Sequence, residues 1–137
     1  MIVRTSSARW QGTLREGSGH VGLGSGSYDG PFTFASRFES GAGTNPEELL
    51  GAALAGCFSM ALAAGLEKAG HPATAVDTTC KVEFDGGVKR FALSCRASVP
   101  GIDAAAFTRL AQETRTGCHV AKALSAVEIT LDAALAD

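Results

Sequence analysis

One stretch of this chain limits its possible folds more than any other. Residues 49–66 contain no charged side chain over eighteen positions, which is close to the length that crosses a lipid bilayer. Most of these residues are alanine or glycine and few are strongly lipophilic. We therefore interpret the stretch as a core helix of a compact protein, not a membrane span. Because it is apolar on all sides, we expect burial on all sides, in part by a partner subunit.

The residues at the two ends of this stretch are those that normally begin and end helices. Asn45 can cap the N-terminus, Pro46 stands at the first helical position, and Glu48 stands at the third. Gly70 then supplies a C-terminal stop. The sequence therefore predicts a helix from Pro46 to about Ala69.

Alternating apolar and polar residues predict strands on both sides of this helix. The expected elements are strands at 8–11, 20–23 and 32–38, then strands at 76–84 and 91–99, a helix from Asp103 to Gly117, a helical turn from Cys118 to about Leu124, and a strand at 127–133. Half-polar strands with helices between them indicate an α+β fold, with antiparallel sheets wrapped around the long buried helix. The length of 137 residues suits one domain, predicted over residues 1–137.

The charge pattern excludes some partners. The net charge is −2 and no basic block occurs, so neither nucleic acid nor an anionic membrane is an expected partner. Charged residues make up 19% of the chain, somewhat below the usual share of a globular protein. Such a surface suggests that a second subunit covers part of it.

The cysteine spacing favours reduced thiols. The four cysteines are Cys57, Cys80, Cys95 and Cys118. They form no CxxC pair, and no secretory signal is visible, so a cytoplasmic protein is expected. Cys80 and Cys95 fall on the apolar faces of neighbouring strands. If Phe84 lies opposite Phe91, these two cysteines lie opposite each other, and we interpret them as packed thiols.

The other two cysteines are candidates for chemistry, although the residue pattern leaves alternatives open. A thiol at Cys57, inside an apolar helix, is more often an inert core residue, and it needs a cation such as Arg37 to become a thiolate. Cys118 follows Gly117 at the start of a new turn, where free N–H groups favour a thiolate. A zinc site from Cys57, Cys118 and His119 matches no common ligand spacing.

Several stretches together resemble the OsmC/Ohr family, the osmotically inducible protein C and organic hydroperoxide resistance proteins. They are residues 36–39 (SRFE), 44–53 (TNPEELLGAA) leading into 55–62 (AGCFSMAL), 99–103 (VPGID) and 117–124 (GCHVAKAL). The resemblance covers essentially the whole chain in order, and the OsmC branch fits better than the Ohr branch.

The resemblance implies an intertwined homodimer with two active sites at the subunit interface. It implies a peroxidase that reduces organic hydroperoxides and, less well, hydrogen peroxide. Cys57 would be the peroxidatic thiolate, Cys118 the resolving thiol, Arg37 the activating cation and Glu47 the residue that orients Arg37. No cofactor or metal is implied. Recycling would use an external dithiol, such as dihydrolipoamide or a lipoyl-bearing protein.

Two further expectations accompany this resemblance. His119 stands where the family commonly has proline. This histidine would lower the thiolate pKa of Cys118, supply a proton or have no effect. Apolar walls from Phe58 or Met60 would favour alkyl hydroperoxides.

Helix geometry adds an expectation about the subunits. Glu47 and Cys57 are ten residues apart, or about 15 Å along a straight helix. We therefore expect a composite site, with Cys57 and Cys118 from one subunit and Arg37 and Glu47 from the other. The alternative is a non-enzymatic stress-related or ligand-binding dimer in which the cysteines are structural.

Overall fold

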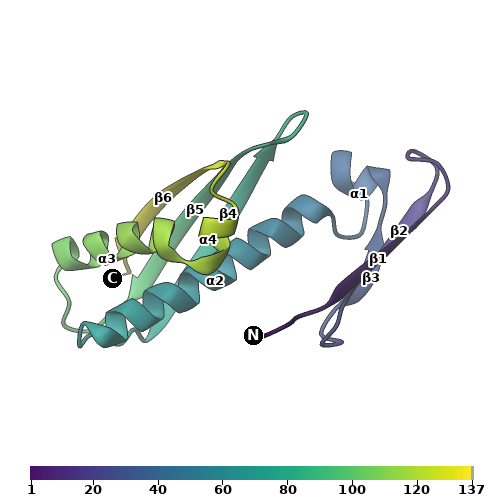
Figure 1. The fold of residues 1–137 in the computed structure, drawn as a ribbon. Coiled ribbons are helices and arrows are strands. Elements are labelled where there is room, and N and C mark those ends of the chain that lie inside the picture. The colour runs from purple at the N-terminus through teal and green to yellow at the C-terminus, as the bar shows by residue number, and fades with distance from the viewer. Residues whose placement is uncertain (137) are drawn as a thin grey trace. The chain divides into compact units, whose positions relative to one another are not determined.

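Residues 1–136 are described by a computed structural model, which has an α+β fold with two small sheets and a long helix central in the chain (Figure 1). The elements are β1 (Ser6–Gln11), β2 (Ser18–Leu23), β3 (Asp29–Phe32), α1 (Phe34–Phe38), α2 (Pro46–Lys68), β4 (Ala75–Phe84), β5 (Val88–Ser98), α3 (Ala104–Gly117), α4 (His119–Ala123) and β6 (Glu128–Leu135). They divide into two compact units, one ending at Leu49 and one beginning at Leu50. The assignment of residues 1–137 to one domain stays a prediction.

The first unit contains an antiparallel sheet in the order β1-β2-β3, followed by α1. The strand predicted at 32–38 is wrong, because β3 ends at Phe32 and the chain turns into α1. The Thr33 hydroxyl accepts a hydrogen bond from the Ser36 N–H (3.0 Å), and the Ser36 hydroxyl accepts one from the Thr33 N–H (2.8 Å). This capping box stabilises a helical turn where the apolar alternation predicted a strand.

The ends of α2 follow the expected signals. The Asn45 side chain accepts from the Glu48 N–H at 2.7 Å, so Asn45 caps the helix as predicted. The Glu48 carboxylate accepts from the Thr44 hydroxyl (2.7 Å), which places it at the start of the helix, where the dipole favours negative charge. At the other end Gly70 has a φ of +87°, a conformation that strains any residue with a Cβ.

Only one stripe of α2 is buried within the chain. Leu54, Phe58, Leu62 and Leu66 recur every four residues and are fully buried. The exposed face of α2 is made of small or apolar residues, namely Ala52, Ala53, Gly56, Met60 and Ala64. A single chain therefore buries one stripe of α2, and the expected burial of the other sides, in part by a partner subunit, stays a prediction. Among residues 1–136, α2 is also the one helix long and apolar enough to cross a membrane, judged by length and composition.

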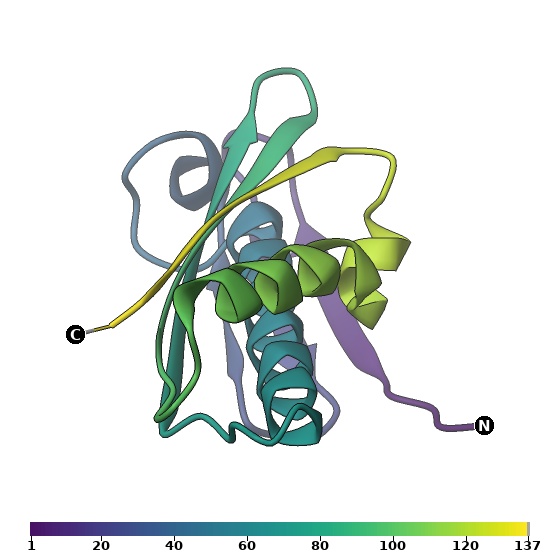
Figure 2. The same ribbon diagram turned by 90° about the vertical axis from the view of Figure 1, so that its left-hand side faces the viewer.

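The second unit contains a mixed sheet in the order β4-β5-β6. β4 pairs with β5 antiparallel, but β5 pairs with β6 parallel, so the expectation of purely antiparallel sheets is wrong. A parallel pair requires a crossover connection, and α3 with α4 supplies it. α2 and α3 lie on the same side of this sheet (Figure 2). The shared core includes Leu54 and Phe58 of α2, Phe91 and Leu93 of β5, and Phe107 of α3.

Two contacts hold α2 close to β4. The Ser59 hydroxyl donates to the Thr78 hydroxyl at 2.7 Å. A Cβ atom placed on Gly51 would lie 3.0 Å from Cγ2 of Val82, tighter than most contacts in proteins. Glycine at this position therefore lets the helix backbone approach the sheet.

The register of the hairpin separates the two strand cysteines. Cys80 lies opposite Leu93, and Cys95 lies opposite Thr78. The expectation that Cys80 faces Cys95 is wrong because Phe91 lies opposite Val82 and not opposite Phe84, a register two residues from the assumed one. Burial raises the pKa of both thiols, and both are reduced. They are core side chains, as interpreted from the sequence.

The buried stripe of α2 makes the first prediction. Leu62→Ala removes a fully buried side chain and leaves a cavity, so the free energy of unfolding should fall by about 2–5 kcal/mol. Urea unfolding followed by circular dichroism measures it. The control Lys68→Ala, at an exposed position of the same helix, should change stability by less than about 0.5 kcal/mol. Equal stability of Leu62→Ala and wild type would contradict this core.

Candidate active site

Two cysteines distant in the sequence meet at one pocket in the second unit. The pocket has a volume of about 650 Å³, within the range of small-molecule sites. Its lining residues are Cys57, Met60, Ala61 and Ala64 from α2, together with Gly117, Cys118 and His119. The structure therefore brings together the two thiols that the sequence singled out, and it leaves Cys80 and Cys95 outside this pocket.

The helix period explains why four residues of α2 line the pocket. Counted from Cys57, the others stand at the third, fourth and seventh following positions, which share one side of an α-helix. Cys57 is half-buried, whereas Met60 is exposed and forms an open wall. This side adjoins the buried stripe, so the packing that buries Phe58 also turns Cys57 toward the pocket.

Cys118 is positioned by two helix ends at once. Its N–H donates to the Thr114 carbonyl at 3.1 Å, which closes α3. Its sulfur accepts from the Ala121 N–H at 3.4 Å, which caps the start of α4. Only 2% of Cys118 is exposed. A side chain held by both caps has little freedom, and it stays directed at the pocket.

The two sulfurs share the backbone donors at the start of α4. The Val120 N–H donates to the sulfur of Cys57 at 3.5 Å, one residue before the N–H that meets Cys118. Burial raises the pKa of the Cys118 thiol, the Ala121 N–H opposes this rise, and the neighbouring Cys57 adds to it. The two sulfurs therefore lie close enough for the charge on one to affect the other, as two thiols that react in sequence must.

The other two predicted site residues form an ion pair in the first unit. The guanidinium of Arg37 donates three hydrogen bonds to the Glu47 carboxylate, from Nε at 3.0 and 3.1 Å and from Nη2 at 2.7 Å. Hydrogen bonding to Glu47 raises the pKa of Arg37. The Glu47 side chain is 7% exposed and that of Arg37 is 38% exposed. Glu47 thus orients Arg37, and part of the guanidinium stays free to meet another group.

Aromatic side chains surround Arg37. A pocket of about 210 Å³ is lined by Trp10, Leu14, Phe32, Thr33, Phe34, Arg37 and Phe38. The Arg37 guanidinium lies 5.0 Å from the centre of the Phe38 ring. An apolar lining weakens the screening of the arginine charge, so this cation can act more strongly than one in water.

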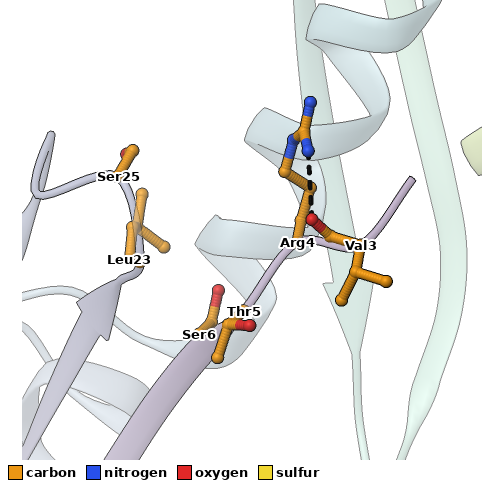
Figure 3. A pocket seen from close by; sticks show the side chains of 7 residues that line it. Val3, Arg4, Thr5, Ser6, Leu23 and Ser25 are labelled. Atoms are coloured by element: carbon orange, nitrogen blue, oxygen red, sulfur yellow. Dashed lines mark hydrogen bonds between the residues drawn. The ribbon is translucent and has the colours of Figure 1, made fainter.

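A third pocket lies at the start of the chain and lacks such chemistry (Figure 3). Its volume is about 460 Å³, and its one charged side chain is Arg4, which donates to the Val3 carbonyl at 3.0 Å. It contains no thiol and no carboxylate. Within residues 1–136, no three histidine, cysteine or acidic side chains cluster in a way that could hold a metal ion.

Two sequence expectations about the pocket walls have different outcomes. Met60 lines the pocket, as expected, but Phe58 lies in the core and does not. Ala61 and Ala64 were not named as site residues, although their spacing from Cys57 could have indicated them. The contact of the Val120 N–H with the Cys57 sulfur could not be predicted from residue type, because every residue except proline carries a backbone N–H.

Comparisons with known proteins show the family. Residues 39–132 match the family model described as OsmC-like protein. The chain is 44% identical to "Peroxiredoxin OsmC" of Escherichia coli (strain K12), over 96% of this chain and 95% of that protein.

Solved structures share the fold at lower identity. One is an organic hydroperoxide resistance protein OsmC from Legionella pneumophila (TM-score 0.70, 23% identity, 97% of this chain and 98% of that chain). Another is an OsmC-like protein from Mycoplasma pneumoniae (TM-score 0.72, 14% identity, 99% of each chain). These likenesses cover both sheets and the long helix.

The surroundings of the four thiols predict their order of reaction. With a limiting amount of iodoacetamide at about pH 7.5, Cys57 should carry most of the label, because it opens into a pocket while burial raises the pKa of the other three thiols. Peptide mass spectrometry measures the label. In urea all four should react alike. Faster labelling of Cys95 or Cys118 in the native protein would contradict this site.

Proposed function

This chain belongs to the OsmC-like protein family, and we propose on that basis that it is a thiol-dependent peroxidase of organic hydroperoxides. The observation that carries the proposal is the shared pocket of Cys57 and Cys118, with adjacent backbone N–H groups directed at both sulfurs. The relative from Escherichia coli carries the name of a peroxiredoxin, and its similarity extends over the whole pocket region.

The first step takes place at Cys57. Its thiolate attacks the terminal oxygen of R–O–OH, the O–O bond breaks, and the alkoxide leaves as an alcohol after gaining a proton. The sulfur is oxidised to a sulfenic acid and the peroxide is reduced. The Val120 N–H stabilises negative charge on this sulfur. The apolar surface of Met60, Ala61 and Ala64 suits the alkyl part of an organic hydroperoxide better than hydrogen peroxide.

The second step joins the two cysteines. The Cys118 sulfur attacks the sulfenic sulfur of Cys57, hydroxide leaves as water, and a disulfide forms. An external dithiol, such as a dihydrolipoyl group on a carrier protein, then reduces this disulfide by exchange and becomes a cyclic disulfide. The opening of the pocket between α2 and the Gly117 turn would admit such a group.

We further propose that the working form is a homodimer. The exposed face of α2 consists of small and apolar residues, and a contiguous exposed apolar face is typical of a protein–protein contact. A second copy of this chain would cover it, and small side chains permit close approach of two helices. Light scattering should give twice the mass of the chain.

The four reduced cysteines suit a cytoplasmic location.

The homodimer would complete the site. Glu47 and Cys57 stand ten positions apart on α2, which runs without a break from Pro46 to Lys68. The ion pair of Arg37 and Glu47 from one subunit would therefore stabilise the Cys57 thiolate of the other. Trp10, Phe34 and the other aromatic residues beside Arg37 would extend the apolar surface for the substrate.

The roles of the thiols predict distinct variant phenotypes. Cys57→Ser should remove cumene hydroperoxide only at the uncatalysed rate, because serine does not form a thiolate. Cys118→Ser should reduce one equivalent of peroxide per Cys57 and stop at the sulfenic acid, which dimedone traps. Stopped-flow peroxide consumption measures both, with dihydrolipoamide present for Cys57→Ser and without added thiol for Cys118→Ser. Cys80→Ser is the matched control and should turn over like wild type. Undiminished peroxide removal by Cys57→Ser would favour a non-enzymatic dimer.

Subunit mixing tests whether the site is composite. Arg37→Met and Cys57→Ser should each be inactive alone. In a mixed dimer, the intact Cys57 of one subunit meets the intact Arg37 of the other, so refolding the two variants together in equal amounts should restore about a quarter of wild-type activity. If each site lies within one subunit, the mixture stays inactive.

A further inference from the structure

His119 is the one ionisable side chain of the thiol pocket that the proposed cycle leaves without a role. It is the first residue of α4, it is exposed, and it lines the same pocket as Cys57 and Cys118. It follows Cys118 directly, so its backbone is held by the caps that hold the resolving thiol. A side chain at this place can reach the pocket without any rearrangement of the core.

The disulfide-forming step needs a group of this kind. Cys118 must lose a proton to attack the sulfenic acid, and the departing hydroxide must gain one. Cys118 is nearly buried, and the desolvation raises its pKa, so few of these thiols are ionised near neutral pH. Of the described residues that line the pocket, the two reacting thiols and His119 alone are titratable.

Resting on the proposed peroxidase function, we propose that His119 is the proton relay for the condensation of Cys118 with oxidised Cys57. The neutral imidazole takes the proton from the Cys118 sulfur as that sulfur attacks. The imidazolium then gives the proton to the hydroxyl that leaves the Cys57 sulfur, and the products are a disulfide and water. The histidine ends in its starting form, so the step is balanced without another reactant.

The side chains around His119 are not suited to relay this proton. Across the pocket, α2 presents Cys57 together with the apolar Met60, Ala61 and Ala64. From α3, Arg115 donates hydrogen bonds to the Ile129 carbonyl and to Gln112, so its guanidinium is engaged elsewhere. Lys122, three positions further along α4, is exposed and cannot accept a proton while charged.

The test measures the two chemical steps separately. One equivalent of cumene hydroperoxide is mixed with reduced protein, and the reaction is quenched in acid at successive times. Alkylation and mass spectrometry then count sulfenic acid and disulfide. In wild type the disulfide-forming rate should rise with pH as neutral imidazole replaces imidazolium, and then level off.

His119→Gln keeps a polar side chain of similar size at an exposed position, so folding should be unaffected. Formation of sulfenic acid should proceed at the wild-type rate. Disulfide formation near pH 7 should slow by about 10- to 100-fold and should rise only at alkaline pH, where the Cys118 thiol itself ionises, because burial raises its pKa. His71→Gln, a histidine outside the pocket, is the matched control and should behave like wild type.

Chemical rescue separates a relay from a structural role. In His119→Ala, added imidazole should restore disulfide formation toward the wild-type rate, because the pocket is open to a small molecule. Imidazole should not help Cys118→Ser. A wild-type pH profile in His119→Gln, or no rescue of a slowed His119→Ala, would overturn the relay. Absence of both sulfenic acid and disulfide in wild type after peroxide would instead overturn the peroxidase function, so the two failures are distinguishable.

Discussion

The packing of α2 against the mixed sheet is the constraint on which the rest of this structure depends. The helix is apolar around its whole circumference, yet one sheet can cover only one side of it. The leucines and Phe58 take that side, and the glycine contact at Gly51 together with the Ser59 hydrogen bond keeps the helix close to β4. This choice fixes the rotation of the helix. Cys57 consequently lies at the edge of the core, where a sulfur is partly desolvated and still accessible.

The chemistry at that edge follows from how few polar groups are present. Backbone N–H groups at the start of α4 are the donors that meet the two sulfurs, and burial raises the pKa of Cys118 in spite of its contact with one of them. Arg37 is held by three hydrogen bonds from its guanidinium to Glu47. Glu47 holds the orientation of Arg37. Part of the guanidinium remains exposed, so it can still contact a second group. An ion pair of this geometry is a prepared partner for a second anion.

Local signals predicted some elements well and failed where two local signals competed. Asn45, Pro46 and Gly70 delimited α2 because caps and stops act within a few residues. The apolar alternation at 32–38 predicted a strand, but the capping box of Thr33 and Ser36 has a stronger local preference. The pairing of Cys80 with Leu93 was missed by two residues along β5, since a register that keeps the same face buried leaves the same apolar alternation in the sequence.

The sequence by itself determined the family, the α+β class and the identity of the two thiols, because these depend on residue types in a fixed order. Tertiary structure alone decided that β6 runs parallel to β5, since strand direction depends on where the α3 crossover returns the chain. It also decided that α2 keeps an uncovered apolar face, because burial depends on how much surface one chain can provide. The meeting of Cys57, Cys118 and His119 at one pocket has the same origin: residues more than sixty positions apart become neighbours only through packing.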